Sequence, residues 1–440
     1  MAYRNKQIPV FLRFLYFLFR VLTFISVHLF YRRRVVLGKE HLRFDGPAIV
    51  VNNHPSTLMD VLNPGLHIHQ EMYFLANYGL FKHPVSNWVF TRLFCIPVKR
   101  KEDVQEGEAR DNRKAFEKSY EHLEASGVLF VAPEGTSYMN RFVRPFKNGT
   151  ARIALGTEER NGFQAGVKII PIGLSYSAPN LFRSDLVIQV GEPILASDYA
   201  QAFAANSTAA YEQLTQNVEN RVREQTVDAR DEAGELLLNQ MEQLVQSEKP
   251  VSLKADFFRS KKLLQDFLDD ATFKEQIQEF YAACEVNSIS PGGMAAYAHR
   301  GHIADGIWLL LGLPVFLIVG LMWFLPCFIP AWVNKKMDLY IGYSSTIKIL
   351  VGLLVFPVVL WGLYKLVLIY TFSRILGLAS LPAFFVLGYL GEGYLDVWKR
   401  WKARRSVAIW AQQDVSVYVH LEELRQNLLE KMGVTQQSGS

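Results

Sequence analysis

The sequence Asn52-Asn53-His54-Pro55-Ser56-Thr57-Leu58-Met59-Asp60 directly follows the apolar run Ala48–Val51. A short apolar run of this kind indicates a buried strand. Ser56 is a residue type that caps helices, so we expect a helix to follow, with Asp60 in or just after its first turn and His54 before it. The stretch therefore predicts a strand that leads through a histidine into a helix.

Similar runs occur on both sides of this stretch. Helical spacing fills the gaps at Glu108–Ser126 and Thr150–Asn161. Short buried strands that alternate with helices predict an α/β domain, which we place at residues 35–197. The further expected strands are Met72–Ala76, Phe94–Val98, Val128–Val131, Val167–Tyr176 and Leu186–Val190.

Residues 1–34 are rich in Phe and Leu but also contain Arg13 and Arg20, which are seven positions apart and so share one helix face. We expect an interfacial amphipathic membrane anchor, with Arg32, Arg33 and Arg34 near the lipid headgroups. A tilted spanning helix is the alternative, although arginines within a span are costly. No small-residue cleavage site follows, which argues against a signal peptide.

The second half of the chain is expected to be helical. Residues 198–290 have the spacing of a helical subdomain, and residues 305–392 hold a transmembrane region in which Pro326 and Pro330 could kink the first segment or turn it back. Residues 393–440 form a basic juxtamembrane segment and a polar helical tail. The three candidate spans are Ile307–Val333, Ile347–Tyr370 and Ile375–Leu390.

The charge distribution indicates a membrane protein. The formal net charge is only +5, but Arg and Lys cluster beside the apolar segments, which suits contact with membrane lipids and argues against nucleic acid as a partner. Cys95, Cys284 and Cys327 are far apart, which favours neither disulfides nor a zinc site. We therefore expect an integral membrane protein whose α/β domain faces the cytosol.

His54 and Asp60 could act as a pair. An aspartate placed just inside the helix can accept a hydrogen bond from one imidazole nitrogen, which leaves the other nitrogen free to take a proton. Histidine suits this role because its pKa lies near neutrality. Taken alone, a histidine at a strand end more often has a purely structural role.

A second polar segment follows the strand Val128–Val131. Glu134 would lie at the same sheet edge as His54 if the two strands are parallel neighbours, and Gly135 would allow backbone N–H groups to approach a phosphate or an oxyanion. Three cations after this turn suit a phosphorylated ligand, although a basic solvated loop is equally compatible with them. They are Arg141, Arg144 and Lys147.

Together these segments resemble the glycerolipid acyltransferases over residues 35–193. Asn53, His54 and Asp60 match the first motif of that family, Phe94–Arg100 the second, Pro133–Thr136 the third, with Lys147 and Gly149 downstream, and Ile169–Ile172 the fourth. The order of the four motifs is also that of the family. The resemblance implies an α/β domain with a mixed sheet flanked by helices.

The departures from the family pattern point to one branch of it. Five residues rather than four separate His54 from Asp60, and Ser137 replaces the usual arginine. Both features, with the apolar segments after the catalytic domain, resemble the fungal-type glycerol-3-phosphate and dihydroxyacetone-phosphate acyltransferases. The missing arginine leaves open which cation binds phosphate.

The resemblance implies an O-acyltransferase of phospholipid synthesis with His54 and Asp60 as catalytic residues. Acyl-CoA or acyl-ACP would be a cosubstrate, and no metal or bound cofactor is expected. The alternatives are a 1-acyl-sn-glycerol-3-phosphate acceptor, a hydrolase and an inactive scaffold; no nucleophile elbow supports the hydrolase. The predicted substrate-binding residues are Arg100, Glu134, Gly135, Thr136, Arg141, Arg144 and Lys147.

Overall fold

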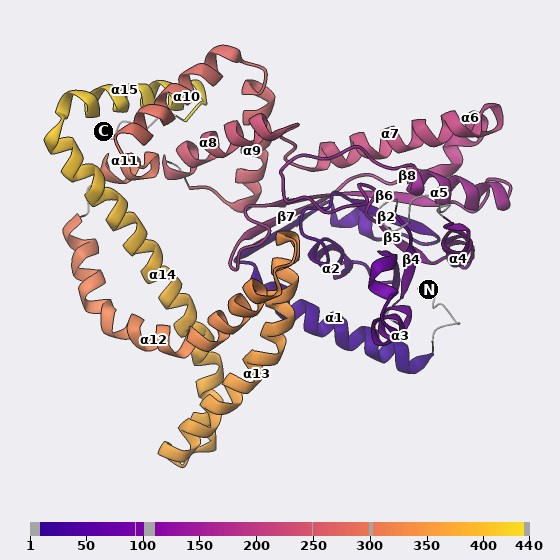
Figure 1. Ribbon diagram of the computed structural model, residues 1–440, viewed down its shortest axis with the longest axis horizontal. Helices are drawn as coiled ribbons and strands as arrows, with labels where there is room; N and C mark the ends of the chain where they lie inside the picture. The colour runs from indigo at the N-terminus through magenta and orange to yellow at the C-terminus, as the bar shows by residue number, and fades with distance from the viewer. Residues whose placement is uncertain (1–8, 93, 101–110, 249, 299–301, 435–440) are drawn as a thin grey trace. The chain divides into compact units, whose positions relative to one another are not determined.

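The computed structural model describes residues 9–92, 94–100, 111–248, 250–298 and 302–434, which form two compact units (Figure 1). The first unit extends to Arg230 and also contains Tyr340–Thr346. The second contains Asp231–Leu339 and the chain from Ile347 onward. The first unit thus extends beyond the domain boundary expected at residue 197, and it includes a short segment from between two long apolar helices.

An eight-stranded sheet forms the centre of the first unit. Six of its strands correspond to those expected from the sequence, which confirms the α/β fold. The sequence did not reveal β1 and β8, both of which lie outside the runs of buried apolar residues. The strands are β1 (Arg33–Leu37), β2 (Ala48–Asn52), β3 (Met72–Asn77), β4 (Cys95–Val98), β5 (Val128–Val131), β6 (Lys168–Tyr176), β7 (Asp185–Val190) and β8 (Ile194–Leu195).

The strand order is β1-β7-β6-β2-β5-β3-β4, with β8 paired to β6. The sheet is mixed, because β6 pairs antiparallel with β7 and with β8 while the other neighbours are parallel. The central strand β2 lies between β5 and β6, and its residues Ala48–Asn52 are all buried. The polar stretch that follows β2 therefore emerges at the middle of the sheet.

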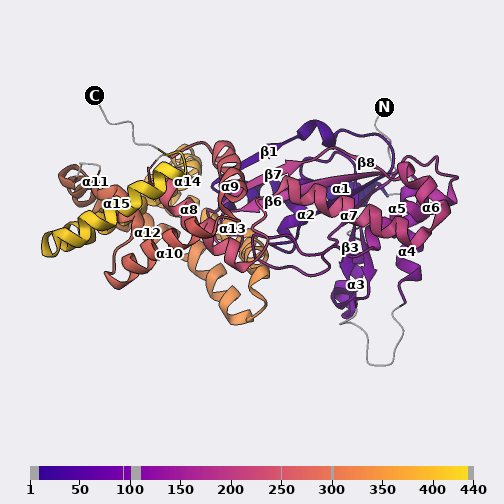
Figure 2. The same cartoon turned by 90° about the horizontal axis from the view of Figure 1, so that it is seen from above.

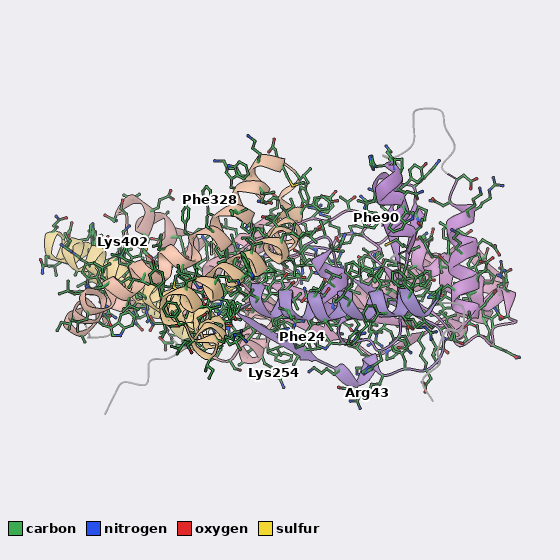
Figure 3. All side chains as sticks on the ribbon, turned by 90° about the horizontal axis from the view of Figure 1, so that it is seen from below. Phe24, Arg43, Phe90, Lys254, Phe328 and Lys402 are labelled. Atoms are coloured by element: carbon green, nitrogen blue, oxygen red, sulfur yellow. The ribbon has the colours of Figure 1, made fainter. Side chains whose placement is uncertain are left out.

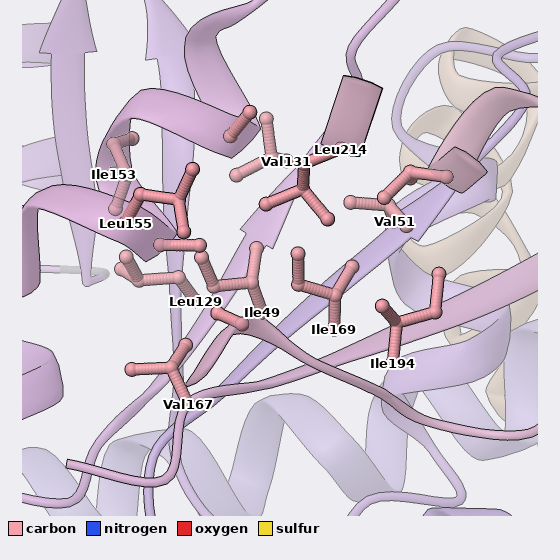
Figure 4. Close-up of a cluster of buried hydrophobic side chains, with 14 of the residues drawn as sticks. Ile49, Val51, Leu129, Val131, Ile153, Leu155, Val167, Ile169, Ile194 and Leu214 are labelled. Carbon is pink, nitrogen blue, oxygen red and sulfur yellow. The ribbon is translucent and has the colours of Figure 1, made fainter. Parts of the chain in front are cut away.

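Helices cover both faces of the sheet. The residues of alternate positions on β2, β5 and β6, such as Ile49, Leu129 and Ile169, pack into one apolar core with three helices (Figure 4). Figures 1 and 2 show α7 running over this face, and Figure 1 shows α1 on the opposite side. The helices of this core are α4 (Arg113–Glu124), α5 (Gly149–Arg160) and α7 (Ser207–Gln225).

Helix α7 explains why the first unit continues past residue 197. Leu214, Val218 and Val222 on one face of α7 are buried in the core beneath β6. The preceding short helix α6 (Ala200–Ala205) packs against α7. The amphipathic pattern expected for a separate helical subdomain thus belongs, in this part of the chain, to the cover of the sheet.

Helix α1 (Val10–Phe30) turns its arginines toward the first unit. Arg20 donates to the carbonyl oxygens of Leu66 and Ile68, and the Tyr16 hydroxyl accepts from the Met72 N–H at 3.3 Å. Exposed apolar side chains occupy the other side of the helix, including Phe11, Phe14, Phe17, Phe24 and Ile25. The arginines thus bind the protein, and the apolar side is left for a lipid phase.

Smaller elements complete the first unit. Helix α2 (Met59–Gly65) follows β2, and α3 (Pro84–Arg92) lies between β3 and β4. Single 3₁₀ turns occur at Lys39–Leu42, Tyr78–Phe81, Ala196–Tyr199 and Ile341–Tyr343.

The second unit is helical throughout its described residues. Arg404 on α14 binds Asp305 on α12 at 2.8 Å and the carbonyl of Ala296 on α11 at 2.7 Å. The ring of Trp323 stacks on Phe384 with centroids 4.7 Å apart. The helices are α8 (Glu232–Glu248), α9 (Leu253–Phe267), α10 (Ala271–Val286), α11 (Pro291–Ala298), α12 (His302–Met337), α13 (Ser344–Thr371, from Ile347 onward), α14 (Arg374–Gln413) and α15 (Val415–Lys431).

Four helices in the described chain are long and apolar enough to cross a bilayer: α1, α12, α13 and α14. The prolines at 326 and 330 do not turn α12 back, since the helix continues to Met337, and Figure 1 shows it as one curved helix. Helix α14 continues from the apolar segment through the basic residues to Gln413. Its apolar and basic parts are therefore one element.

Candidate active site

The two polar motifs meet at one edge of the sheet because β2 and β5 are parallel neighbours, with Val51 beside Val131. His54 follows β2 and Glu134 follows β5, so both leave the sheet at its carboxyl edge. The backbone N–H of His54 donates to Oε1 of Glu134 at 3.3 Å. The structure therefore brings His54 and Glu134 into direct contact.

His54 also contacts Asp60. The Nδ1 atom of His54 lies 3.0 Å from Oδ2 of Asp60, and the Asp60 side chain is fully buried while that of His54 is 13% exposed. Oδ1 of Asp60 accepts from the hydroxyl of Tyr176 at 2.9 Å. Asp60 is thus held on one side by a tyrosine, and the Nε2 edge of the imidazole is left for a substrate.

The turn between His54 and Asp60 differs from the expected helix cap. Ser56 does not cap α2, whose first residue is Met59 and whose capping position is Leu58. Instead the backbone N–H of Ser56 donates to Oδ2 of Asp60 at 2.6 Å, and Thr57 adopts a φ of 47°. The carboxylate therefore binds the turn that precedes its own helix, and this accommodates the extra residue between His54 and Asp60.

Two asparagines fix the strand end before this turn. Asn52 is fully buried, and its side-chain amide donates to the carbonyl of Asp60 at 2.6 Å. Asn53 donates to the carbonyl of Leu174 at 2.9 Å and accepts from its N–H at 2.8 Å, which extends the pairing of β2 and β6 through a side chain. Both asparagines position the loop that carries His54.

Burial determines the ionisation of the acids in the site. Burial raises the pKa of Asp60, and the contact with His54 opposes that rise. Burial raises the pKa of Glu134 to about 8, while the His54 N–H lowers it and the charge of Asp60 raises it further. Glu134 is therefore largely a neutral acid at pH 7 and has a proton to donate.

Gly135 has no side chain, and this leaves room for the ammonium group of a lysine beside its backbone. Its φ is +78°, a conformation that glycine adopts without strain, and a Cβ built on it would lie 2.5 Å from Nζ of Lys147. The Lys147 backbone N–H donates to the carbonyl of Pro133 at 3.0 Å. The ammonium of Lys147 thus lies over the Gly135 backbone, and Thr136 follows half-exposed.

Arg144 and Arg141 occupy the loop that follows. The guanidinium of Arg144 lies 3.8 Å from the ring centre of Tyr138, and its charge lowers the pKa of Glu134. Arg141 lines a hollow together with Asn53 and Pro55. Of the expected cations, the structure therefore brings Arg144 and Lys147 to Glu134 and Gly135, and Arg141 beside the loop that carries His54.

A network at the end of α7 holds this basic loop. Glu219 accepts from the N–H of Phe146 at 2.8 Å, and Asp228 accepts from the N–H of Val143 at 3.0 Å. Arg223 binds both acids, at 2.9 Å and 2.6 Å. A segment expected to lie outside the catalytic domain thus supports the loop with Arg141 and Arg144.

Arg100 lies farther away. It follows the edge strand β4, which is separated from β2 by β3 and β5. At about 4.8 Å per strand, the strand ends that carry Arg100 and His54 are ~14 Å apart. The structure therefore does not bring Arg100 to His54, although both lie at the carboxyl edge of the sheet.

The segment Tyr340–Thr346 belongs to the first unit and packs on the turn between His54 and Asp60. The Thr57 hydroxyl donates to the carbonyl of Gly342 at 3.1 Å and lies 3.3 Å from the Thr346 hydroxyl. The hydroxyls of Ser56 and Ser345 both donate to the carbonyl of Pro179. All four hydroxyl-bearing residues are buried. Nothing in the sequence of this segment revealed its role.

The sequence analysis did not identify Tyr176, although a tyrosine at the end of an apolar strand was a signal that could have revealed it.

In the described residues no group of three or more His, Cys, Asp and Glu side chains could hold a metal ion.

Comparisons with known proteins identify the domain that carries this site. The acyltransferase family model matches residues 33–175. Glycerol-3-phosphate O-acyltransferase 2 of Saccharomyces cerevisiae is 30% identical over 28% of this chain and 16% of its own length. A chloroplastic 1-acyl-sn-glycerol-3-phosphate acyltransferase of Brassica napus is 29% identical over 37% of this chain and 42% of its own length. The matched region thus spans less than half the length of either relative.

A solved structure gives a weaker likeness. The 1-acyl-sn-glycerophosphate acyltransferase PlsC of Thermotoga maritima aligns with a TM-score of 0.36 and 23% identity, over 48% of this chain and 78% of that one.

The range that the family model matches contains the strands β2 and β5, the His54–Asp60 pair and Glu134. Residues 33–175 are therefore a domain of the acyltransferase family, and the relatives that they match are acyltransferases of glycerolipid type.

Proposed function

We propose that this chain is a membrane-bound O-acyltransferase that moves a fatty acyl group from a thioester, acyl-CoA or acyl-ACP, to a hydroxyl of glycerol 3-phosphate or dihydroxyacetone phosphate. The single observation that supports it most is the 3.0 Å contact between Nδ1 of His54 and the buried Asp60, beside Glu134 and a basic loop. This arrangement leaves Nε2 of His54 for the acceptor hydroxyl.

In the proposed reaction, Nε2 of His54 takes the hydroxyl proton as the oxygen attacks the thioester carbonyl. Asp60 holds the imidazole and stabilises its positive charge. When the tetrahedral intermediate collapses, the carbon–sulfur bond breaks and the imidazolium returns the proton to the thiolate. The products are an ester and a free thiol, so atoms and charges balance without another reactant.

The acceptor's phosphate would bind the basic loop. Lys147 over Gly135 and Arg144, whose charge acts on Glu134, supply two positive charges at the turn that follows β5. Glu134, as a neutral acid, would donate a hydrogen bond to the acceptor without repelling its phosphate. Arg100 follows an edge strand that is not a neighbour of β2, so we assign the phosphate first to Lys147 and Arg144.

Two relatives have different printed activities, one on glycerol 3-phosphate and one on its 1-acyl form, so the relatives support both acceptors. A lysophosphatidate acceptor is therefore the second candidate. We also propose that the basic residues 399–405, which continue helix α14 beyond its apolar part, lie on the cytosolic side of the membrane, and that the catalytic domain lies on the same side.

The test is an acyl transfer assay in membranes, with a labelled thioester donor and with glycerol 3-phosphate or its 1-acyl form as acceptor. We expect His54→Ala to lower transfer by at least about 10³-fold, since both base and imidazolium are lost. Asp60→Asn should leave a small fraction of activity. His69→Ala, an exposed histidine, is the matched control. Wild-type activity in His54→Ala would refute the proposal, and transfer to water alone would indicate a hydrolase.

A further inference from the structure

The three consecutive arginines at residues 32–34 have different surroundings. Arg32 and Arg33 both bind the carboxylate of Asp185, at 2.9 Å and 2.5 Å. Arg34, on β1, points away from this carboxylate, and its Nη1 lies 3.3 Å from Nε2 of His28 on α1. Arg32 and Arg33 therefore share one counterion, and Arg34 instead lies within hydrogen-bond distance of an imidazole nitrogen.

Arg34 has donors that no protein group accepts. Its Nε and Nη2 atoms are buried, and neither has a hydrogen-bond partner. Within the described parts of the chain no carboxylate forms an ion pair with it. Buried donors without an acceptor, and a buried charge without a counterion, are both unfavourable. Such an arrangement suits a position that an anion fills.

The groups nearest to Arg34 supply no negative charge at neutral pH. Tyr31 and Tyr176 are its electrostatic partners, and burial raises the pKa of both phenols, so they stay protonated. Burial of the guanidinium itself lowers the pKa of Arg34. The position therefore carries an excess of positive charge that the protein does not compensate.

His67, just after α2, adds a further unused donor or acceptor. Its Nε2 atom is buried and has no hydrogen-bond partner. Burial, together with the nearby charges of Arg34, Lys39 and Arg20, lowers the pKa of His67 to about 4. Arg34, Arg20 and Lys39 all act on His67 as positive charges, so His67 and Arg34 share one positive region.

This region lies beside the apolar side of α1. His28 is exposed, and its ring lies 4.0 Å from that of Phe24. Phe24 is 54% exposed on the side of α1 that carries the other free aromatic rings (Figure 3). An anion bound at Arg34 would therefore belong to a molecule that also meets an apolar surface.

We propose that Arg34, His28 and His67 form a binding site for a phosphate group, and that the group is the headgroup phosphate of an anionic membrane lipid. The guanidinium offers two parallel N–H donors, a geometry that matches two phosphate oxygens. The site is separate from the basic loop at residues 141–147, and it does not depend on the acyl transfer proposed above.

The test uses the full-length protein in nanodiscs of phosphatidylcholine, to which phosphatidic acid is added in steps. A ligand that binds only the folded state raises its unfolding temperature with ligand concentration. We expect the wild type to show this rise. Arg34→Gln should need roughly 10- to 100-fold more phosphatidic acid for the same rise, because a charge-assisted contact is lost. His28→Gln should show a smaller loss.

Arg33→Gln is the matched control, since Asp185 keeps its contact with Arg32 and the net charge changes by the same amount. It should respond as the wild type does. In pure phosphatidylcholine, Arg34→Gln should unfold at a temperature no lower than the wild type, because the lost charge had no partner. This control separates loss of binding from loss of folding.

A second arm adds inorganic phosphate to phosphatidylcholine nanodiscs. A response to phosphatidic acid alone assigns the site to a lipid headgroup, whereas an equal response to inorganic phosphate assigns it to a soluble phosphate. Three results would overturn the proposal. They are no response in the wild type to either ligand, an unchanged response in Arg34→Gln, and an equal loss in Arg33→Gln.

Discussion

The hydroxyl of Thr57 lies 3.1 Å from the carbonyl oxygen of Gly342, although 285 positions separate the two residues in the chain. Thr57 is part of the turn whose Ser56 N–H binds Asp60, and its own N–H donates to the hydroxyl of Ser137 at 3.3 Å. The segment between α12 and α13 thus contacts the same turn that sets the distance between His54 and Asp60.

Removal of the Thr57 hydroxyl should slow the reaction without a matching change in substrate binding. Thr57→Val keeps the shape of the β-branched side chain. It leaves the Gly342 carbonyl unpaired, at a cost of about 1–3 kcal/mol in stability. We expect kcat to fall by about tenfold at a nearly unchanged KM, and Thr57→Ser to restore most of it. Steady-state kinetics in membranes measure both values.

Thr157→Val is the control for this variant, because Thr157 is also buried in the first unit. Its hydroxyl donates to the carbonyl of Ile153 within its own helix. A fall in kcat of the same size in both variants, or no recovery in Thr57→Ser, would show that the effect is one of general stability.

The pKa of Glu134 predicts a dependence of stability on pH. Its carboxyl ionises near pH 8 in the folded protein and near 4.5 in the unfolded chain, so the unfolded state loses its proton first as the pH rises. The folded state therefore loses stability between these two values, by up to about 1.4 kcal/mol per pH unit, and the loss is complete above pH 8.

Glu134→Gln removes this contribution while it keeps the shape of a neutral acid. Unfolding temperatures of the two proteins, measured from pH 5 to 9, should diverge as the pH rises, with the variant the more stable at pH 9. Parallel curves would contradict the assignment. A separate pH–rate profile would show whether a neutral Glu134 is the active form, since activity of the wild type should then decline above pH 8.

The network at the end of α7 should affect the acceptor more than the donor. Asp228→Asn removes the charge that holds Arg223, and it weakens the contact with the Val143 N–H. Because the loop with Arg141 and Arg144 loses its support, we expect KM for the phosphorylated acceptor to rise by roughly 5- to 20-fold. KM for the acyl thioester should change by less than about twofold. Equal changes in both constants would argue against the role of this loop in phosphate binding.

A buried ion pair should determine the stability of the second unit. Arg425 on α15 is 1% exposed and binds Glu422 of its own helix and Glu248 at the end of α8. Arg425→Met removes the ion pair of Glu248, whose side chain is buried, and this costs about 3–5 kcal/mol. Hydrogen exchange should show faster opening of α15 and α8, whereas α5 and β2 in the first unit should keep their protection.

The sequence predicted the centre of this fold because its signals are local. Buried apolar runs that end in polar residues or Gly and Pro identified β2 and β5, and their parallel pairing placed Glu134 beside His54. The resemblance to glycerolipid acyltransferases agrees with the family match over residues 33–175.

Other features depend on long-range packing, which no local pattern contains. Tyr176 reaches Asp60 only because β6 is the neighbour of β2, and Arg100 is remote only because β4 is at the sheet edge. The apolar face of α7 has the same period whether the helix packs on a sheet or on other helices. The sequence therefore could not show that α7 belongs with the sheet, and the first unit extends to Arg230 rather than ending at residue 197.

The alternation of the chain between its two units has a consequence for biogenesis. A ribosome completes residues up to Arg230 about a hundred residues before it reaches Tyr340, a delay of several seconds or more at ordinary rates of synthesis. During that time the turn at Thr57 lacks the carbonyl of Gly342. A nascent chain should therefore gain its mature catalytic turn only after helix α12 has been made, which would delay the onset of activity until the enzyme has had time to reach its membrane.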